Sequence, residues 1–151
     1  MIRPATATDL PELCALREAN AAAHLALDPR AYRIPERAAV ERHFRAFLAD
    51  PARGVVLLEP GGGMVEIVRN PPPPDHQILR PLPSAQIHTV VHSAARGHGT
   101  GARLVAAAHR WAAAQGIAYL TAGIHHANAG AVRFYARHGY TPSGAALIHH
   151  L

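Results

Sequence analysis

The sequence predicts a single α/β domain over residues 1–151, with a mixed, twisted sheet of about six or seven strands and four helices around it. The length suits one domain, and 49% apolar residues suffice for one core. Short β-branched segments alternate with segments of helical periodicity. In the second half, a strand, a glycine-rich turn, a helix and a strand follow one another, which indicates a βαβ unit with parallel strands.

The first half of the chain predicts two helices and three strands. Asp9 is positioned to cap a helix, with Pro11 in its first turn and leucines at helical spacing after it. The turn Pro60-Gly61-Gly62-Gly63 between two β-branched segments predicts a hairpin. The expected strands cover residues 2–7, 55–58 and 64–68, and the expected helices cover residues 9–27 and 35–49.

A proline-rich segment at residues 70–84 separates the two halves. Its four consecutive prolines, Pro71 to Pro74, favour an extended backbone. We expect a plain loop here, and the alternative is a ligand for a binding partner. Beyond it, the expected strands cover residues 87–91 and 117–124, the expected helices cover 102–114 and 128–138, and residues 140–151 are expected to be extended.

Charges are distributed unevenly along the chain. All ten acidic residues lie at or before Asp75, whereas six arginines and no acid follow it. A basic half indicates an anionic partner, either nucleic acid or a multiply phosphorylated cofactor. The same distribution means that any catalytic carboxylate must come from the first half.

No segment has the length and hydropathy of a membrane span or a secretion signal, so we expect a cytoplasmic protein without a membrane partner. The single cysteine, Cys14, cannot form an internal disulfide and is expected to be a buried thiol. The spacing of the 12 histidines matches no zinc site, so no metal ion is predicted.

The residues Arg96-Gly97-His98-Gly99-Thr100-Gly101 stand between a predicted strand and a predicted helix. Glycines leave the backbone N–H groups of such a turn unobstructed, and the helix directs its positive end to the same place. Both features favour a phosphate group, and Arg96 and Arg103 could pair with it. The segment lacks the lysine of a Walker A loop, and no acid follows it as a nicotinamide site requires.

The order of these motifs resembles the GCN5-related N-acetyltransferase (GNAT) superfamily. Its cofactor motif, Arg/Gln-x-x-Gly-x-Gly/Ala, is met by Arg96, Gly99 and Gly101. Asn128 and the segment from Ala131 to Tyr140, which reads AVRFYARHGY, are similar to a second family motif. The opening residues 2–10 are similar to a common family start, so the resemblance covers nearly the whole chain.

The resemblance implies an N-acyltransferase that moves an acetyl group from acetyl-CoA to a primary amine by direct attack. It places the CoA pyrophosphate on the glycine-rich turn and the pantetheine arm along the preceding strand. The residues implied to bind the cofactor are Thr89, Val90, Val91, Arg96, Gly97, His98, Gly99, Thr100, Gly101, Asn128 and Tyr135. Tyr135 would also protonate the departing thiolate. The structural alternatives are packing of Tyr135 beside Phe134 and a helix N-cap for Asn128.

The base that deprotonates the acceptor is less clearly marked. Many relatives carry a glutamate on the strand before the turn, where this chain has Ala85-Gln86-Ile87-His88. The candidate side chains are His88, whose neutral imidazole accepts a proton, and Glu66 on a neighbouring strand, with a water chain as the third alternative. The acceptor would be a small-molecule or peptide amine, selected by the first two helices and the loop at 70–84.

Two other functions stay open at this point. The missing strand glutamate is compatible with a non-catalytic acyl-CoA-binding or sensor protein of the same fold. A nucleic-acid-binding module would fit the basic half, but interleaved aromatic residues and a binding motif are missing, so no nucleic-acid partner is expected. Family members often form homodimers, which leaves a homodimer as an open expectation.

Overall fold

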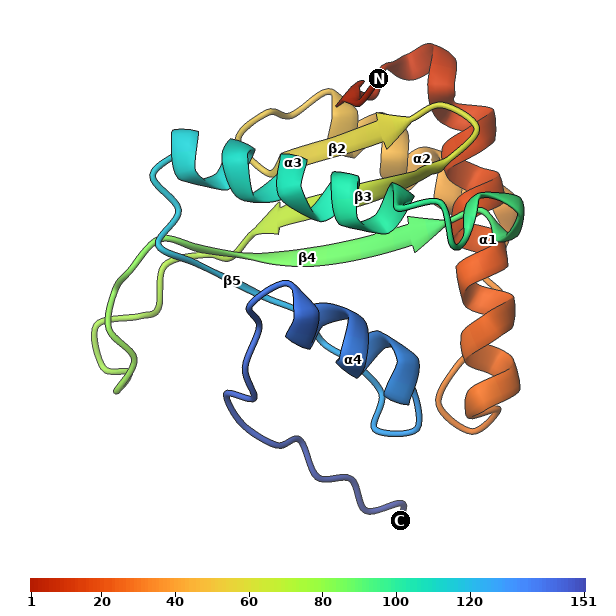
Figure 1. Cartoon of the computed structure of the whole chain (residues 1–151). Helices are drawn as coiled ribbons and strands as arrows, with labels where there is room; N and C mark the ends of the chain where they lie inside the picture. The colour runs from red at the N-terminus through yellow and green to blue at the C-terminus, as the bar shows by residue number, and fades with distance from the viewer.

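The computed structural model describes residues 1–151 and contains one five-stranded sheet with helices on both faces (Figure 1). The strands lie in sequence order: β1 (Arg3–Pro4), β2 (Gly54–Glu59), β3 (Gly63–Arg69), β4 (Ser84–Val91) and β5 (Tyr119–Thr121). Strands β1 to β4 pair antiparallel, and β5 joins β4 in parallel. The helices α1 (Leu10–Leu27) and α2 (Arg37–Leu48) cover one face, and α3 (Thr100–Ala114) and α4 (Ala129–Arg137) cover the other.

The predicted α/β fold with a mixed sheet and four helices is confirmed, but the sheet has five strands rather than about six or seven. Residues 140–151 form neither helix nor strand, because no neighbouring strand pairs with them. The strand expected at 117–124 is reduced to Tyr119–Thr121, where it pairs with β4. None of the helices is both long and apolar enough to span a bilayer.

Side chains of successive strand residues alternate between the two faces of the sheet. One face carries a core shared with α1 and α2, which includes Leu13, Cys14, Leu16, Phe44, Phe47, Val56, Leu58 and Met64. The other face carries a core shared with α3 and α4, which includes Leu57, Val65, Ile67, Ile87, Leu104, Val105 and Tyr135. Cys14 is therefore a buried thiol, as predicted.

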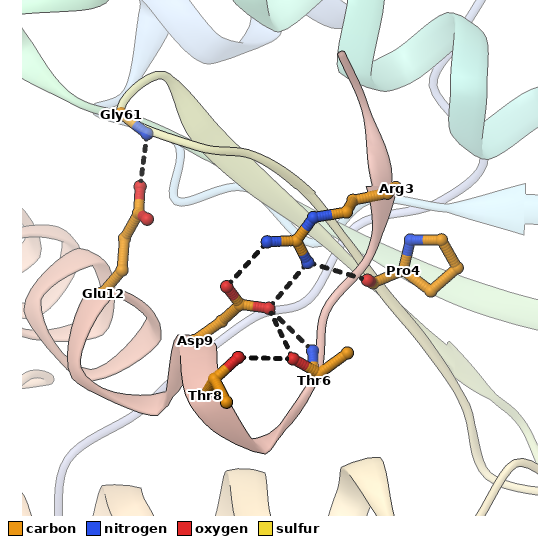
Figure 2. Close-up of polar contacts among 7 residues, drawn as sticks. All are labelled: Arg3, Pro4, Thr6, Thr8, Asp9, Glu12 and Gly61. Carbon is orange, nitrogen blue, oxygen red and sulfur yellow. Dashed lines mark hydrogen bonds and ion pairs between the residues drawn. The ribbon is translucent and has the colours of Figure 1, made fainter.

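Polar contacts hold the chain at the start of α1 (Figure 2). The guanidinium of Arg3 donates two hydrogen bonds to the Asp9 carboxylate, at 2.8 and 2.9 Å, and the backbone N–H of Thr6 donates another at 2.8 Å. The hydrogen bond from Arg3 holds the pKa of Asp9 well below its usual value. Asp9 is the N-cap residue of α1 and Pro11 lies in its first turn, as predicted, but the carboxylate makes no cap bond to this helix.

The proline-rich loop, residues 70–83, projects from the sheet between β3 and β4 (Figure 1). It contains no helix or strand, as predicted, and most of its residues are exposed. The loop precedes Ser84 at the first end of β4, whereas the glycine-rich turn follows Val91 at the other end, roughly 25 Å away along an eight-residue strand. The expectation that this loop helps to select the acceptor stays a prediction.

Candidate functional site

The glycine-rich turn connects β4 to α3 through a short 3-10 helix, Ser93–Ala95. Gly97 and Gly99 have φ angles of +78° and +77°, a left-handed conformation that other residues rarely adopt. Gly99 is the N-cap of α3, and no side chain caps the helix. The positive end of a 15-residue helix, with uncapped N–H donors, therefore faces the turn.

The contacts around each glycine show which side of the turn is open to a ligand. A Cβ on Gly97 would meet no atom within 4 Å, whereas a Cβ on Gly101 would meet the Phe134 ring at 3.0 Å. Gly101 thus permits the close approach of α4, where the Phe134 and Tyr135 rings pack edge to face at 5.1 Å. The outer side of the turn stays open, and its residues fit a pyrophosphate group, which requires unobstructed N–H donors.

Arg103 is held by other groups of the protein in this structure. Its guanidinium contacts the Glu59 carboxylate at 2.6 Å and donates to the backbone oxygen of His98 at 2.8 Å. The buried hydroxyl of Thr100 donates to the same carboxylate at 3.3 Å. Arg103 is thus paired with Glu59 in this structure, and its contact with phosphate stays a prediction. Arg96 is exposed and forms no ion pair.

The edge of β4 that faces β5 is free over its second half, because β5 pairs with β4 only over residues 84–86. At the end of β4, the N–H of His92 donates to the backbone oxygen of Gly62, towards β3, at 2.9 Å. Backbone groups of an antiparallel strand alternate in direction. The N–H and C=O groups of Thr89 and Val91 therefore point to the free edge.

Residues of α4 and its N-cap lie near this edge. The Tyr135 side chain is 8% exposed, and its hydroxyl donates to Thr89 Oγ1 at 3.0 Å. Burial raises the pKa of Tyr135, so the phenol keeps its proton. Asn128 is the N-cap of α4, where its Oδ1 accepts the N–H of Ala131 at 3.2 Å, and its side-chain NH₂ group forms no bond. Val90 directs its backbone to β3, so it offers the free edge no polar group.

Glu66 and His88 face the opposite side of the sheet, towards α1 and α2. They are direct partners across β3 and β4. Glu66 is 3% exposed and contacts Arg17 of α1 at 2.6 Å and His43 of α2 at 3.0 Å. Burial alone would raise the pKa of Glu66, but the hydrogen bond from His43 and the charge of Arg17 outweigh it and lower this pKa.

His88 differs from Glu66 in that the residue is partly exposed to solvent and its ring forms no hydrogen bond. Partial burial lowers the pKa of His88, and the charge of Arg17 lowers it further, while the charge of Glu66 raises it. The imidazole is therefore neutral near pH 7 and can accept a proton. No local sequence pattern indicates Arg17 or His43, which lie 49 and 23 residues from Glu66.

A second contact joins the end of α1 to the loop before α4. His125 Nε2 lies 2.9 Å from Asp28 Oδ2, and the Tyr32 ring lies 4.9 Å from that of His24 and 5.8 Å from that of His125. The hydrogen bond with His125 lowers the pKa of Asp28. No three His, Cys, Asp or Glu side chains are grouped to hold a metal ion.

A cavity of about 930 Å³ lies between α3, β5, α4 and residues 139–146. Its lining is mostly apolar, and Tyr135 is the one predicted site residue in it. It does not reach the glycine-rich turn, so we do not assign it to the cofactor site.

Comparison with known proteins gives a family and a fold. The model of the acetyltransferase (GNAT) family matches residues 18–140, and no curated relative matches the chain. A transcriptional regulator from Bacillus halodurans C-125 is 25% identical, with a TM-score of 0.74 over 100% of this chain and 99% of the other.

Two solved acetyltransferases share the fold. A Trypanosoma brucei acetyltransferase is 18% identical, with a TM-score of 0.68 over 100% of this chain and 99% of that one. An aminoglycoside antibiotic 6′-N-acetyltransferase from Acinetobacter haemolyticus is 15% identical, with a TM-score of 0.74 over 100% and 97% of the two chains. At these identities the likeness is one of fold alone.

Proposed function

The chain belongs to the acetyltransferase (GNAT) family, and we propose on this basis that it transfers an acetyl group from acetyl-CoA to a primary amine. The observation that carries the proposal is the free edge of β4, which leads to the open side of the glycine-rich turn. The amide groups of a pantetheine arm can pair with Thr89 and Val91 as a further strand would. The pyrophosphate would then lie against the N–H groups around Gly97 and Gly99.

The groups that can move protons lie on opposite faces of the sheet beside this edge. Tyr135 lies on the face of α3 and α4, and its hydroxyl is bonded to Thr89. Glu66 and His88 lie on the face of α1 and α2. A donor placed along the edge would thus have a proton acceptor on one face and a proton donor on the other, which suits attack and departure from opposite sides.

When bound, acetyl-CoA supplies a thioester carbonyl that a neutral amine attacks. The backbone N–H groups at the free edge can polarise that carbonyl. As the C–N bond forms and the C–S bond breaks, Tyr135 gives its proton to the sulfur. The proton that the new amide nitrogen loses restores the phenol.

Thiol release tests the proposed reaction. The chain is incubated with acetyl-CoA and a panel of small amines and peptides, and free CoA thiol is measured. We expect release that depends on one class of amine. Binding of acetyl-CoA without release for any amine would instead support the non-catalytic acyl-CoA-binding alternative.

Two glycine variants test the cofactor site itself. Gly97 and Gly116 both have positive φ, at +78° and +70°, and a Cβ on either would meet no atom within 4 Å. Gly97→Ala and Gly116→Ala should therefore cost similar stability, about 1 kcal/mol each. Calorimetry should show CoA affinity about tenfold weaker in Gly97→Ala alone. Equal affinity in both variants would contradict the site.

A further inference from the structure

Four side chains meet on the face of the sheet that carries α1 and α2: Arg17, His43, Glu66 and His88. Oε2 of Glu66 accepts a hydrogen bond from Nη2 of Arg17 at 2.6 Å, and Oε1 contacts Nε2 of His43 at 3.0 Å. Each carboxylate oxygen thus has a partner, and the side chain is 3% exposed. This burial leaves an acceptor amine little access to Glu66.

His88 has the access that Glu66 lacks. The two residues are direct cross-strand partners, so their side chains lie on one face with Cα atoms about 5.5 Å apart. The His88 ring is exposed and forms no hydrogen bond, so its nitrogens are free to meet an acceptor. His88 is also next to Thr89, whose backbone faces the free edge where the acyl donor would lie.

We propose that His88 is the base that takes the proton from the acceptor ammonium, and that Arg17, His43 and Glu66 are positioning residues that act through it. The inference rests on the proposed acetyl transfer and assigns its base. The His88 ring nitrogen forms a bond to a proton of the ammonium. The N–H bond that breaks leaves its electron pair on the amine nitrogen. The imidazolium returns the proton to solvent, to which its ring is exposed.

The positioning residues have separate tasks. The negative charge of Glu66 stabilises the imidazolium that forms on His88. Arg17 keeps Glu66 ionised and stands over the Phe44 ring at 5.2 Å, while His43 stacks on the Phe47 ring at 5.9 Å. These ring contacts orient the Arg17 and His43 side chains towards the Glu66 carboxylate. Arg17 from α1 and Glu66 from β3 are the charged groups that act on His88, and His43 from α2 contacts Glu66.

The test is the pH profile of kcat/KM for one amine in a set of variants, since this profile reports the free enzyme's base. In Glu66→Gln the acidic limb should move to lower pH by about one unit, because the imidazolium loses a neighbouring negative charge. In Arg17→Gln it should move to higher pH, because a neighbouring positive charge is lost. A purely structural role would lower activity in both variants without opposite shifts.

His88 itself is tested by removal. In His88→Gln the acidic limb should disappear and kcat should fall about 100-fold. In His88→Ala added imidazole should restore part of the rate. Histidine ¹³C NMR titration of the unliganded chain gives a readout without turnover, in which His88 is identified by its loss in His88→Gln. Its titration midpoint should shift in the same two directions.

The control is Glu41→Gln, the same substitution in an exposed ion pair with Arg45 on α2. It should leave the profile unchanged. If acetyl transfer occurs but His88→Gln keeps the acidic limb, or Glu66→Gln and Arg17→Gln shift nothing, the assignment of His88 is overturned while acetyl transfer stands. If the unmodified chain releases no thiol with any amine, the proposed function fails, whatever the NMR midpoints are.

Discussion

Tyr135 is a phenol whose protonation state is fixed by its surroundings. Its side chain is buried among residues of α3, β4 and its own helix, and burial raises its pKa. The hydrogen bond to Thr89 orients the hydroxyl towards the free edge of β4. A protonated, oriented phenol is a proton donor and not a base, which agrees with the role implied by the family motif.

Tyr135→Phe should lower kcat between 10- and 100-fold and leave the KM for acetyl-CoA nearly unchanged, because only the proton donor is removed. Loss of the hydrogen bond to Thr89 should cost about 1 kcal/mol of stability. Steady-state thiol release measures kcat and KM, and thermal unfolding measures the loss of stability. The control is Tyr119→Phe, a half-exposed tyrosine on β5, which should behave as the unmodified chain. Full kcat in Tyr135→Phe would remove the tyrosine from the mechanism.

At the residue scale, sequence reasoning found the groups whose role depends on a local pattern. The N-cap position of Asn128 follows from neighbours within a few residues. It did not find the partners of Asp9 and Arg103, which only the fold reveals: Arg3 for Asp9 and Glu59 for Arg103. Ion pairs between residues that are far apart in the sequence produce no recognisable spacing pattern.

At the element scale, side-chain contacts tie α1 to the turns around the site. Oε1 of Glu12 accepts the backbone N–H of Gly61 in the β2–β3 hairpin at 2.8 Å (Figure 2). The same oxygen lies 3.3 Å from Nε2 of His92, which leads into the glycine-rich turn. At the other end of α1, Asp28 is held by His125. The helix is thus fixed at both ends to segments that border the site.

The tie between Asp28 and His125 has a pH dependence of known sign. The folded pKa of Asp28 lies below its ordinary value, so its contribution to stability is present above that value and is lost as the pH falls through the folded pKa. Asp28→Asn should lower Tm by about 2 °C at pH 7. The difference from the unmodified chain should shrink at pH 3.

Thermal unfolding at both pH values measures this effect. Asp75→Asn serves as the control, since Asp75 lies on the exposed loop and forms no ion pair. A difference between Asp28→Asn and the unmodified chain that stays constant from pH 7 to pH 3 would mean that the carboxylate charge contributes nothing.

Elements with a strong periodic pattern were predictable. The hairpin around Gly61, the loop at 70–83 and all four helices lie where the sequence indicates. The extent of β5 was not predictable, because β5 pairs with β4 only over residues 84–86 although β4 continues to Val91. Residues 140–151 pair with no strand and therefore have no strand structure.

At the scale of the whole molecule, folding compensates only a small part of the uneven charge of the sequence. Acids of the first half contact basic side chains of the second half at Glu59–Arg103, Asp28–His125 and Glu12–His92. Of the six arginines after Asp75, Arg103 alone forms an ion pair, so the second half keeps most of its positive charge. This charge is compatible with an anionic ligand, which the proposed function places at the helix end beside the turn.

The shared sheet predicts that the two cores unfold together. Phe44 belongs to the core of α1 and α2, Leu104 to the core of α3 and α4, and both are fully buried. Phe44→Ala and Leu104→Ala should each cost about 3–5 kcal/mol and lower Tm by about 10 °C. Because β2, β3 and β4 contribute side chains to both cores, neither can lose its packing without disturbing the other.

Differential scanning calorimetry should therefore record one transition in the unmodified chain and in each variant, with equal calorimetric and van't Hoff enthalpies. Val132→Ala, on the exposed side of α4, should change stability by less than about 0.5 kcal/mol. Two separate transitions, with Phe44→Ala shifting one and Leu104→Ala the other, would show that residues 1–151 form two cooperative units. His88 on β4 and Tyr135 on α4 would then belong to separate cooperative units.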